Sequence, residues 1–283
     1  MNRELRVEKI TSSDIVSLVS MGKNDELGWD NFGAPFLTYV GHLRMERFFG
    51  EPLDDEDTAF NLEWGKRCEK SAYDELLAKS EDFLDLKNQE DQAEKTKIHA
   101  TIDKWCGTPD YFKLEEPKKV GDIKSPVSKS KLYDLINPLY KVQEDGTKIK
   151  IQVNGSDVIA LLRKGSKKLG LAPSKEAEKY YWQLVSNACI LESIYGGSFM
   201  GELAVYCPTE ENVNKIIDWN NVLFNSGEIT PGQYYVIDRK FTLPHVKDDS
   251  SIDEINIITF DIPQTDKDFL TYRVKKAIEL INQ

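Results

Sequence analysis

Apolar residues recur every four positions through residues 58–79, TAFNLEWGKRCEKSAYDELLAK, which is the spacing of one face of an α-helix. The repeat consists of Phe60, Trp64, Cys68, Ala72 and Leu76, and Tyr73 and Leu77 widen it. Glu69 lies on the flank of this stripe, in the row Gly65–Glu69–Tyr73. We therefore expect a helix that packs on a core, with the Glu69 carboxylate half-buried at the edge.

A second helical pattern covers residues 173–195. Its apolar face consists of Ala177, Tyr181, Leu184, Ala188, Leu191 and Tyr195, while Gln183 and Asn187 share a flank. Strand-like segments follow at 202–207, 233–243 and 254–262, and an amphipathic helix is predicted over 266–281. This mixture of helices and strands predicts an α/β or α+β domain.

Two short segments, GTPDYF (107–112) and VGDIKSP (120–126), have the pattern of paired strands, yet each carries an acid. Residues i and i+2 of a strand project from one face, so Asp122 and Lys124 point together, and a paired strand brings Asp110 close. Adjacent carboxylates repel each other unless a cation lies between them, and such oxygen ligands suit Mg²⁺ or Mn²⁺. The hairpin predicts a metal-dependent phosphodiesterase centre in which Lys124 positions or deprotonates a water molecule. The alternative is an edge hairpin with a surface Asp–Lys pair.

The net charge of −11 argues against binding of nucleic acid through overall charge. Residues 113–179 are an exception, because they contain 15 Lys or Arg against nine Asp or Glu. The densest basic run holds Arg163, Lys164, Lys167 and Lys168, and it is either a solvated surface or a track for a phosphate backbone. Residues 127–175 are otherwise predicted to be irregular, with a second hairpin that turns at Asp145-Gly146.

The cysteine and histidine residues are not spaced as a zinc site or as part of a Ser–His–Asp system. Cys68, Cys106, Cys189 and Cys207 lie far apart without a CxxC pair, and the three histidines are not spaced as ligands. We expect buried thiols in a reducing compartment; an iron–sulfur cluster is the alternative, and zinc or Ser–His–Asp chemistry is disfavoured. No signal peptide and no apolar run of about 18 residues is seen, which predicts a soluble intracellular protein.

Four segments in order carry a family resemblance. They are Arg6-Val-Glu-Lys-Ile-Thr-Ser-Ser13-Asp14, Leu62-Glu-Trp-Gly-Lys-Arg-Cys-Glu69, Pro109-Asp110 with Asp122-Ile123-Lys124, and Tyr180-Tyr-Trp-Gln183. They resemble the R-x-x-x-I-T-x-S-[DE] segment, the W-G-K-x-x-E helix, the PD-(D/E)XK motif and the Y-x-x-Q helix of the phage lambda exonuclease branch of the PD-(D/E)XK nucleases. The matches span residues 6–183.

The resemblance implies roles for individual residues. Asp110 and Asp122 would bind Mg²⁺ or Mn²⁺ with the Ile123 carbonyl, and Glu69 would join them directly or through a water molecule. Lys124 would activate or steady the attacking water, and Gln183 would orient that water or a substrate phosphate. Arg6 and Ser13 would form a pocket for a DNA 5′-phosphate. Separately from the motifs, positive charge makes six residues candidates for contact with the DNA backbone: Lys118, Lys119, Arg163, Lys164, Lys167 and Lys168.

The resemblance also implies a fold and a reaction. The expected fold is α/β, with a restriction-endonuclease-like core in which helices flank a central mixed β-sheet, as a single domain over 1–283 with an insertion at about 127–175. The expected function is a 5′-to-3′ double-strand DNA exonuclease for recombination or repair in the bacterial cytoplasm, of host or phage origin. The expected partners are duplex DNA ends, a single-strand annealing protein and further copies of the chain, and no membrane. A restriction-type or structure-specific endonuclease and a catalytically idle DNA-end-binding module are the alternatives.

The chain departs from the lambda exonuclease pattern in three places. The second acid of the motif is Asp122 instead of the usual Glu. The segment between Lys124 and Tyr180 is longer, and its position near the DNA path puts the ring-shaped trimer of lambda exonuclease in question. Asn187 stands where some related nucleases have Tyr.

Overall fold

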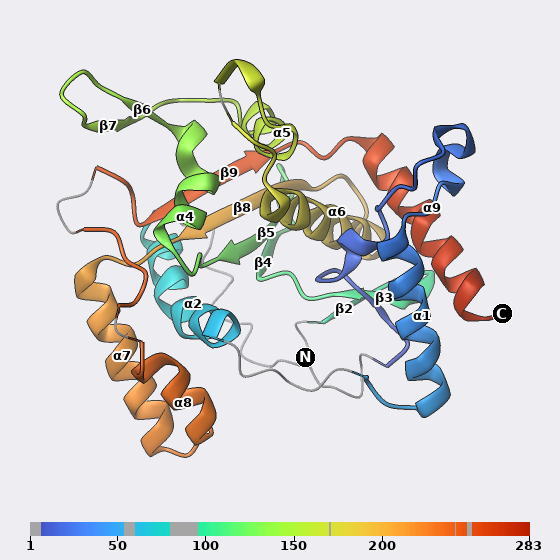
Figure 1. The fold of residues 1–283 in the computed structure, drawn as a ribbon, viewed down its shortest axis with the longest axis horizontal. Helices are drawn as coiled ribbons and strands as arrows, with labels where there is room; N and C mark the ends of the chain where they lie inside the picture. The colour runs from blue at the N-terminus through green and yellow to red at the C-terminus, as the bar shows by residue number, and fades with distance from the viewer. Residues whose placement is uncertain (1–6, 54–59, 80–95, 170, 241, 248–250) are drawn as a thin grey trace.

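A computed structural model describes residues 7–53, 60–79, 96–169, 171–240, 242–247 and 251–283, and the structural statements below concern these residues. A four-stranded sheet lies at the centre (Figure 1). Its strands, in spatial order, are β4 (Tyr111–Lys113), β5 (Lys119–Lys124), β8 (Met200–Tyr206) and β9 (Ile255–Phe260). β5 and β8 are parallel and the other two pairs are antiparallel, so the predicted mixed sheet of an α/β fold is confirmed.

The sheet separates two apolar cores because side chains alternate along each strand. On β8, Leu203 and Val205 belong to the core that contains α6 (Lys175–Tyr195) and α9 (Gln264–Ile281). Ala204 and Tyr206, from the same strand, belong to a core with α2 (Phe60–Lys79), α7 (Glu210–Asn225) and α8 (Pro231–Asp238). The strand is therefore covered by helices on both faces, which explains why it is buried along most of its length.

The predicted helices over 58–79, 173–195 and 266–281 are confirmed as α2, α6 and α9, with residues 58 and 59 outside the described part. α2 buries Trp64, Cys68, Ala72 and Leu76, as its four-residue repeat predicts. α6 differs from the one-sided helix that was expected, because every residue from Tyr181 to Leu191 is buried. It is enclosed by strands of both larger sheets and by α5 (Gly155–Lys164) and α9.

The remaining elements surround this centre. A second sheet holds β1 (Ile10–Thr11), β3 (Ile102–Gly107) and β2 (Lys97–His99) in that order, and α1 (Ala34–Phe49) packs beside α9. Short 3₁₀ helices cover Ile15–Ser17, Asp25–Asp30, Asn137–Leu139 and Lys167–Leu169. No helix among the described residues combines the length and the apolar character needed to cross a lipid bilayer.

The 127–175 segment is more ordered than its sequence suggested. The predicted second hairpin is confirmed as β6 (Tyr140–Val142) and β7 (Lys148–Lys150), and Gly146 takes the positive φ of 84° that its turn requires. The segment also contains α4 (Lys129–Ile136) and α5, which were not predicted. Two expectations stay predictions: that the 127–175 segment is an insertion in a single domain, and that this domain has a restriction-endonuclease-like core.

The strand predicted over 233–243 is wrong. Residues 231–238 form α8 instead, and the physical reason lies just before them. Thr230 accepts a hydrogen bond from the Gln233 backbone while the Gln233 side chain caps the Thr230 backbone, and Pro231 occupies the first helical position. This capping box outweighs the β propensity of the apolar and aromatic run that follows it.

Candidate active site

An open cleft of about 600 Å³ lies where the end of β5 meets α2 and α6. All five residues predicted to be catalytic line it, namely Glu69, Asp110, Asp122, Lys124 and Gln183. The segment that follows β5, Ser125 to Val127, and Lys131 of α4 complete one wall. The structure thus brings together side chains that are more than 100 residues apart in the chain.

Asp122 and Lys124 project from one face of β5, as their spacing predicts. The Lys124 Nζ atom lies 2.6 Å from the Asp122 Oδ2 atom. Asp122 is 1% exposed, and its other oxygen, Oδ1, accepts a hydrogen bond of 2.9 Å from the Gln183 amide of α6. Both oxygens of this buried carboxylate are therefore fixed in position by neighbours on different elements.

Asp110 stands immediately before β4, whereas the sequence placed it within a strand. The pairing of Tyr111 with Gly121 still brings it beside the second strand of the hairpin. Its Oδ2 atom accepts a hydrogen bond of 2.6 Å from the backbone N–H of Ile123. The Tyr73 hydroxyl of α2 donates to the Asp110 carbonyl oxygen at 2.8 Å, so the backbone of this residue is held as well.

The two aspartate carboxyl groups disfavour each other's ionisation. Burial and, after it, the negative charge of Asp122 raise the pKa of Asp110 to about 8. Burial alone would lower the pKa of Lys124, but the carboxylates of Asp122 and Asp110 outweigh it, and the pKa is raised. Lys124 is therefore an ammonium group here, and one positive charge faces two carboxyl groups.

Tyr180 is a neighbour of Lys124 for which the sequence predicted no role. The Lys124 Nζ atom lies 5.1 Å from the centre of the Tyr180 ring, which is within the range of a cation–π contact. Tyr180 and Gln183 are three residues apart on α6, so one helix face contacts both members of the Asp122–Lys124 pair. The Tyr180-Tyr-Trp-Gln183 segment was the available signal, since it contains both residues.

The acids in the cleft suit a divalent cation held by few protein ligands. Asp110 and Asp122 offer hard oxygen atoms, and burial and the neighbouring Asp122 charge raise the pKa of Asp110, so a cation that entered would favour its ionised form. No group of three His, Cys, Asp or Glu side chains close enough to hold a metal occurs among the described residues. Glu69 lines the cleft without completing such a group, so its predicted place beside a metal, like that of the Ile123 carbonyl, stays a prediction.

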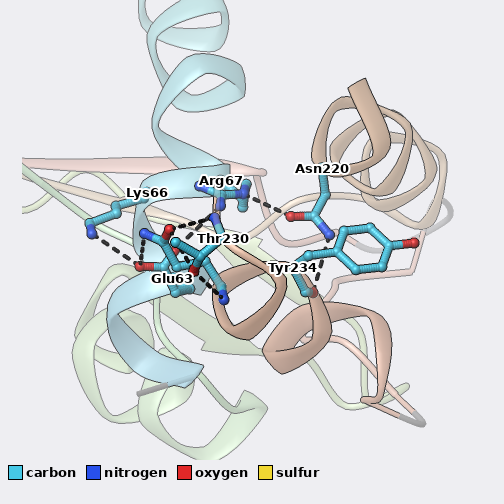
Figure 2. A network of polar contacts seen from close by, with 7 residues as sticks. Glu63, Lys66, Arg67, Asn220, Thr230 and Tyr234 are labelled. Atoms are coloured by element: carbon cyan, nitrogen blue, oxygen red, sulfur yellow. Dashed lines mark hydrogen bonds and ion pairs between the residues drawn. The ribbon is translucent and has the colours of Figure 1, made fainter. Parts of the chain in front are cut away.

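A polar network joins α2 to the α7–α8 pair (Figure 2). Glu63 is 1% exposed, and its carboxylate accepts from Lys66 at 3.0 Å and from Arg67 at 3.1 Å. Arg67 also donates to Asn220 of α7 at 2.9 Å, and Asn220 contacts the backbone of Tyr234 in α8. Because Lys66 lines the cleft as well, this network ties one wall of the cleft to the α7–α8 pair.

Of the two residues predicted to bind the 5′-phosphate, only Ser13 belongs to the described part of the chain. Arg6 lies outside the described residues. Ser13 does not line the cleft, and its hydroxyl contacts Thr11 at 2.9 Å and the Asp14 carboxylate at 3.2 Å. The pocket formed by Arg6 and Ser13 stays a prediction.

None of the six residues predicted along the DNA backbone lines the cleft. Lys118 donates to the Gly196 carbonyl at 2.8 Å, and Lys119 lies 3.1 Å from Glu202. Arg163 contacts Glu178 at 2.5 Å and covers the Tyr181 ring at 3.6 Å, so it fastens α5 to α6. Lys164, Lys167 and Lys168 are exposed. The basic residues that do line the cleft, besides Lys124, are Lys66, Lys131 and Lys179.

The sequence matches no protein-family model and no curated protein. The fold is similar to that of LHK-Exo in complex with dAMP, with a TM-score of 0.48 and 10% identity over 99% of this chain and 91% of that chain. It is also similar to an alkaline exonuclease (LHK-Exo) from Laribacter hongkongensis, with a TM-score of 0.46 and 11% identity over the same shares.

Proposed function

We propose that the protein is a Mg²⁺- or Mn²⁺-dependent deoxyribonuclease that degrades duplex DNA from a 5′ end. The observation that carries the proposal is the meeting of Asp110, Asp122, Lys124 and Gln183 in one open cleft. Two neighbouring carboxylates suit a divalent cation, and the ammonium group beside them suits a phosphate. The resemblance of the four sequence segments to the lambda exonuclease branch supports the choice of DNA ends as substrate.

The residues of the chain have distinct parts in this reaction. Asp110 and Asp122 would hold the cation, with Glu69 and the Ile123 carbonyl as further candidate ligands. When bound, the cation supplies Lewis acidity at a phosphate oxygen and lowers the pKa of a water molecule. Lys124 carries a proton beside the two carboxyl groups, so we assign it to steadying the attacking water or a phosphate oxygen.

Two further residues keep this arrangement in place. Gln183 holds Asp122 through its amide, and Tyr73 holds the backbone of Asp110 through its hydroxyl. Neither donor changes its charge near neutral pH, so both can keep their contacts while a substrate enters. The two aspartates are thus preorganised for a cation before it binds.

Recognition of the DNA end is the part of the proposal that rests on the sequence motif alone. Arg6 and Ser13 would bind the 5′-phosphate. A homo-oligomer, a single-strand annealing protein as partner, and a role in recombination or repair in the bacterial cytoplasm are likewise proposed from the resemblance.

The decisive experiment incubates the protein with linear and covalently closed circular duplexes in Mg²⁺ or in EDTA. We expect the linear duplex to be degraded, faster when its 5′ ends are phosphorylated, and the closed circle to stay intact. Degradation of the closed circle would favour an endonuclease. Binding of ends without hydrolysis in Mg²⁺ or Mn²⁺ would favour a catalytically idle module.

A further inference from the structure

We propose that a second cleft, in the 127–175 segment, binds a nucleotide of the substrate strand next to the phosphodiester that is hydrolysed. The inference rests on the proposed nuclease function and adds a subsite to it. The second cleft has a volume of about 500 Å³ and lies between α4, α5 and the start of α6. This volume falls within the range of sites that hold small ligands, which is about 300–1,000 Å³.

The walls of the second cleft have the mixed character that a nucleotide requires. Pro138 and Leu161 are among the apolar residues that line it and offer contact for the faces of a base. Asn137 and Asp134 offer hydrogen-bonding groups for the edge of a base. Lys175, at the start of α6, offers a positive charge for a phosphate.

The two clefts share a wall, which is the reason to assign both to one strand. Lys131 of α4 and Glu176 of α6 line both of them and form an ion pair. Their side chains are 44% and 34% exposed, so the pair is weakly held and its ammonium group can exchange a carboxylate for a phosphate. A strand that passes from one cleft to the other would present a phosphate at this point.

Three lysines lie in sequence from the catalytic cleft to the second cleft. Lys179 lines the catalytic cleft, Lys131 lines both, and Lys175 lines the second cleft. Lys175 and Lys179 are four residues apart on α6, so they lie on one side of the helix. Their charges complement a phosphate backbone, whereas the acids of the catalytic cleft alone would repel it.

The test compares a substrate that needs both clefts with one that needs only the catalytic cleft. The first is a 5′-phosphorylated duplex oligonucleotide, and the second is thymidine 5′-p-nitrophenyl phosphate. Ala172→Trp places an indole in the second cleft from an exposed loop position that tolerates it. We expect kcat/KM for the oligonucleotide to fall about tenfold, which corresponds to ~1.4 kcal/mol, and kcat/KM for the small diester to fall by much less.

Leu169→Trp is the matched control, because Leu169 is 61% exposed in the same segment and lines neither cleft. It should leave the ratio of the two kcat/KM values as in the parent. If the parent hydrolyses neither substrate in Mg²⁺ or Mn²⁺, the proposed function fails. If the parent hydrolyses both and Ala172→Trp lowers them by one common factor or leaves them unchanged, only the second subsite is wrong.

A second pair of variants gives effects of opposite sign. Glu176→Gln releases Lys131 from its carboxylate, so the oligonucleotide should bind about threefold more tightly in EDTA at low salt, whereas Lys131→Ala should weaken binding by a similar factor. If the ion pair only supported the fold, the two substitutions would not change the dissociation constant of the oligonucleotide in opposite directions. Two changes of the same sign, or two unchanged dissociation constants, would remove Lys131 from the strand path.

Discussion

Two acids on neighbouring strands of the central sheet, Asp122 of β5 and Glu202 of β8, are each 1% exposed. Because Gly121 pairs with Glu202 and Asp122 with Leu203, the two side chains project from opposite faces of the sheet. Glu202 accepts hydrogen bonds from the Tyr111 hydroxyl at 2.9 Å and the Thr259 hydroxyl at 2.8 Å, and Lys119 lies 3.1 Å away. Its negative charge is fully surrounded by donors.

Asp122 has a different environment. It has one amide donor and one ammonium group, but a second carboxyl group, that of Asp110, stands beside it and has a raised pKa. Donors satisfy the acid that stabilises the sheet, whereas the acid in the cleft is placed near a like charge. Such an arrangement lowers stability unless a cation or substrate enters, and it distinguishes a binding site from a structural contact.

The largest effect is expected from Asp122→Asn, which removes a carboxylate from the cleft. The rate of degradation of a 5′-phosphorylated linear duplex in Mg²⁺ should fall by at least about a thousandfold, equal to ~4 kcal/mol of barrier. The melting temperature in EDTA should change little, because the Asn oxygen still accepts from Gln183 and the lost repulsion from Asp110 offsets the lost ion pair with Lys124. A variant that retains a tenth of the parent rate would exclude Asp122 as a metal ligand.

Glu202→Ala should show the reverse pattern. It leaves Lys119 and two hydroxyl groups around a buried gap, so the free energy of unfolding should fall by about 3 kcal/mol. The rate per folded molecule should stay close to that of the parent at low temperature. Glu211→Ala is the control, since Glu211 is 75% exposed and its pair with Lys215 should contribute little to stability. Equal losses of stability in the two variants would contradict the comparison.

Gly121→Ala tests the packing between the two acids. A Cβ atom on Gly121 would lie 1.9 Å from the Tyr111 ring, so this ring would have to move. Its hydroxyl group donates to Glu202, and that hydrogen bond would be disturbed. Denaturant unfolding should show a loss of about 2 kcal/mol, and a Tyr111→Leu background should reduce that loss.

Gly41→Ala is the matched control for this substitution. Gly41 lies in α1, and a Cβ atom added there would meet no neighbouring group of the described residues within 4 Å, so alanine should stabilise the helix slightly. A Gly121→Ala variant as stable as the parent would show that the Tyr111 ring moves freely.

The smallest effect is expected from Tyr180→Leu, which removes the ring beside Lys124 and leaves a smaller apolar side chain in its place. At a half-buried site such as this one a cation–π contact contributes about 1 kcal/mol, so kcat should fall roughly fivefold with little change in melting temperature. A fall as large as that of Asp122→Asn would mean that Tyr180 itself contacts the substrate. An unchanged kcat would mean that Asp122 alone positions Lys124.

Much of the candidate site was accessible from the sequence because its residues lie on regular elements. The two-residue period of a strand placed Asp122 and Lys124 together, and the helical period placed Glu69 on the flank of α2. Tyr73 and Tyr180 were missed as neighbours of these residues, since their contacts depend on how α2 and α6 cross the sheet. The DNA-backbone residues were chosen by charge, yet Arg163 and Lys119 contact acids that are distant in the chain or on another strand.

The sequence by itself determined the helices α2, α6 and α9, the hairpin that carries Asp110, Asp122 and Lys124, and the second hairpin at Asp145-Gly146. These features depend on local periodicity and turn chemistry, which a short stretch of chain contains. Only the tertiary structure decided which buried acid lies beside a second carboxyl group and which is surrounded by donors, and which lysines face the cleft. Those properties depend on side chains that come from separate elements, and electrostatic interactions fall off with distance in space and not with separation along the chain.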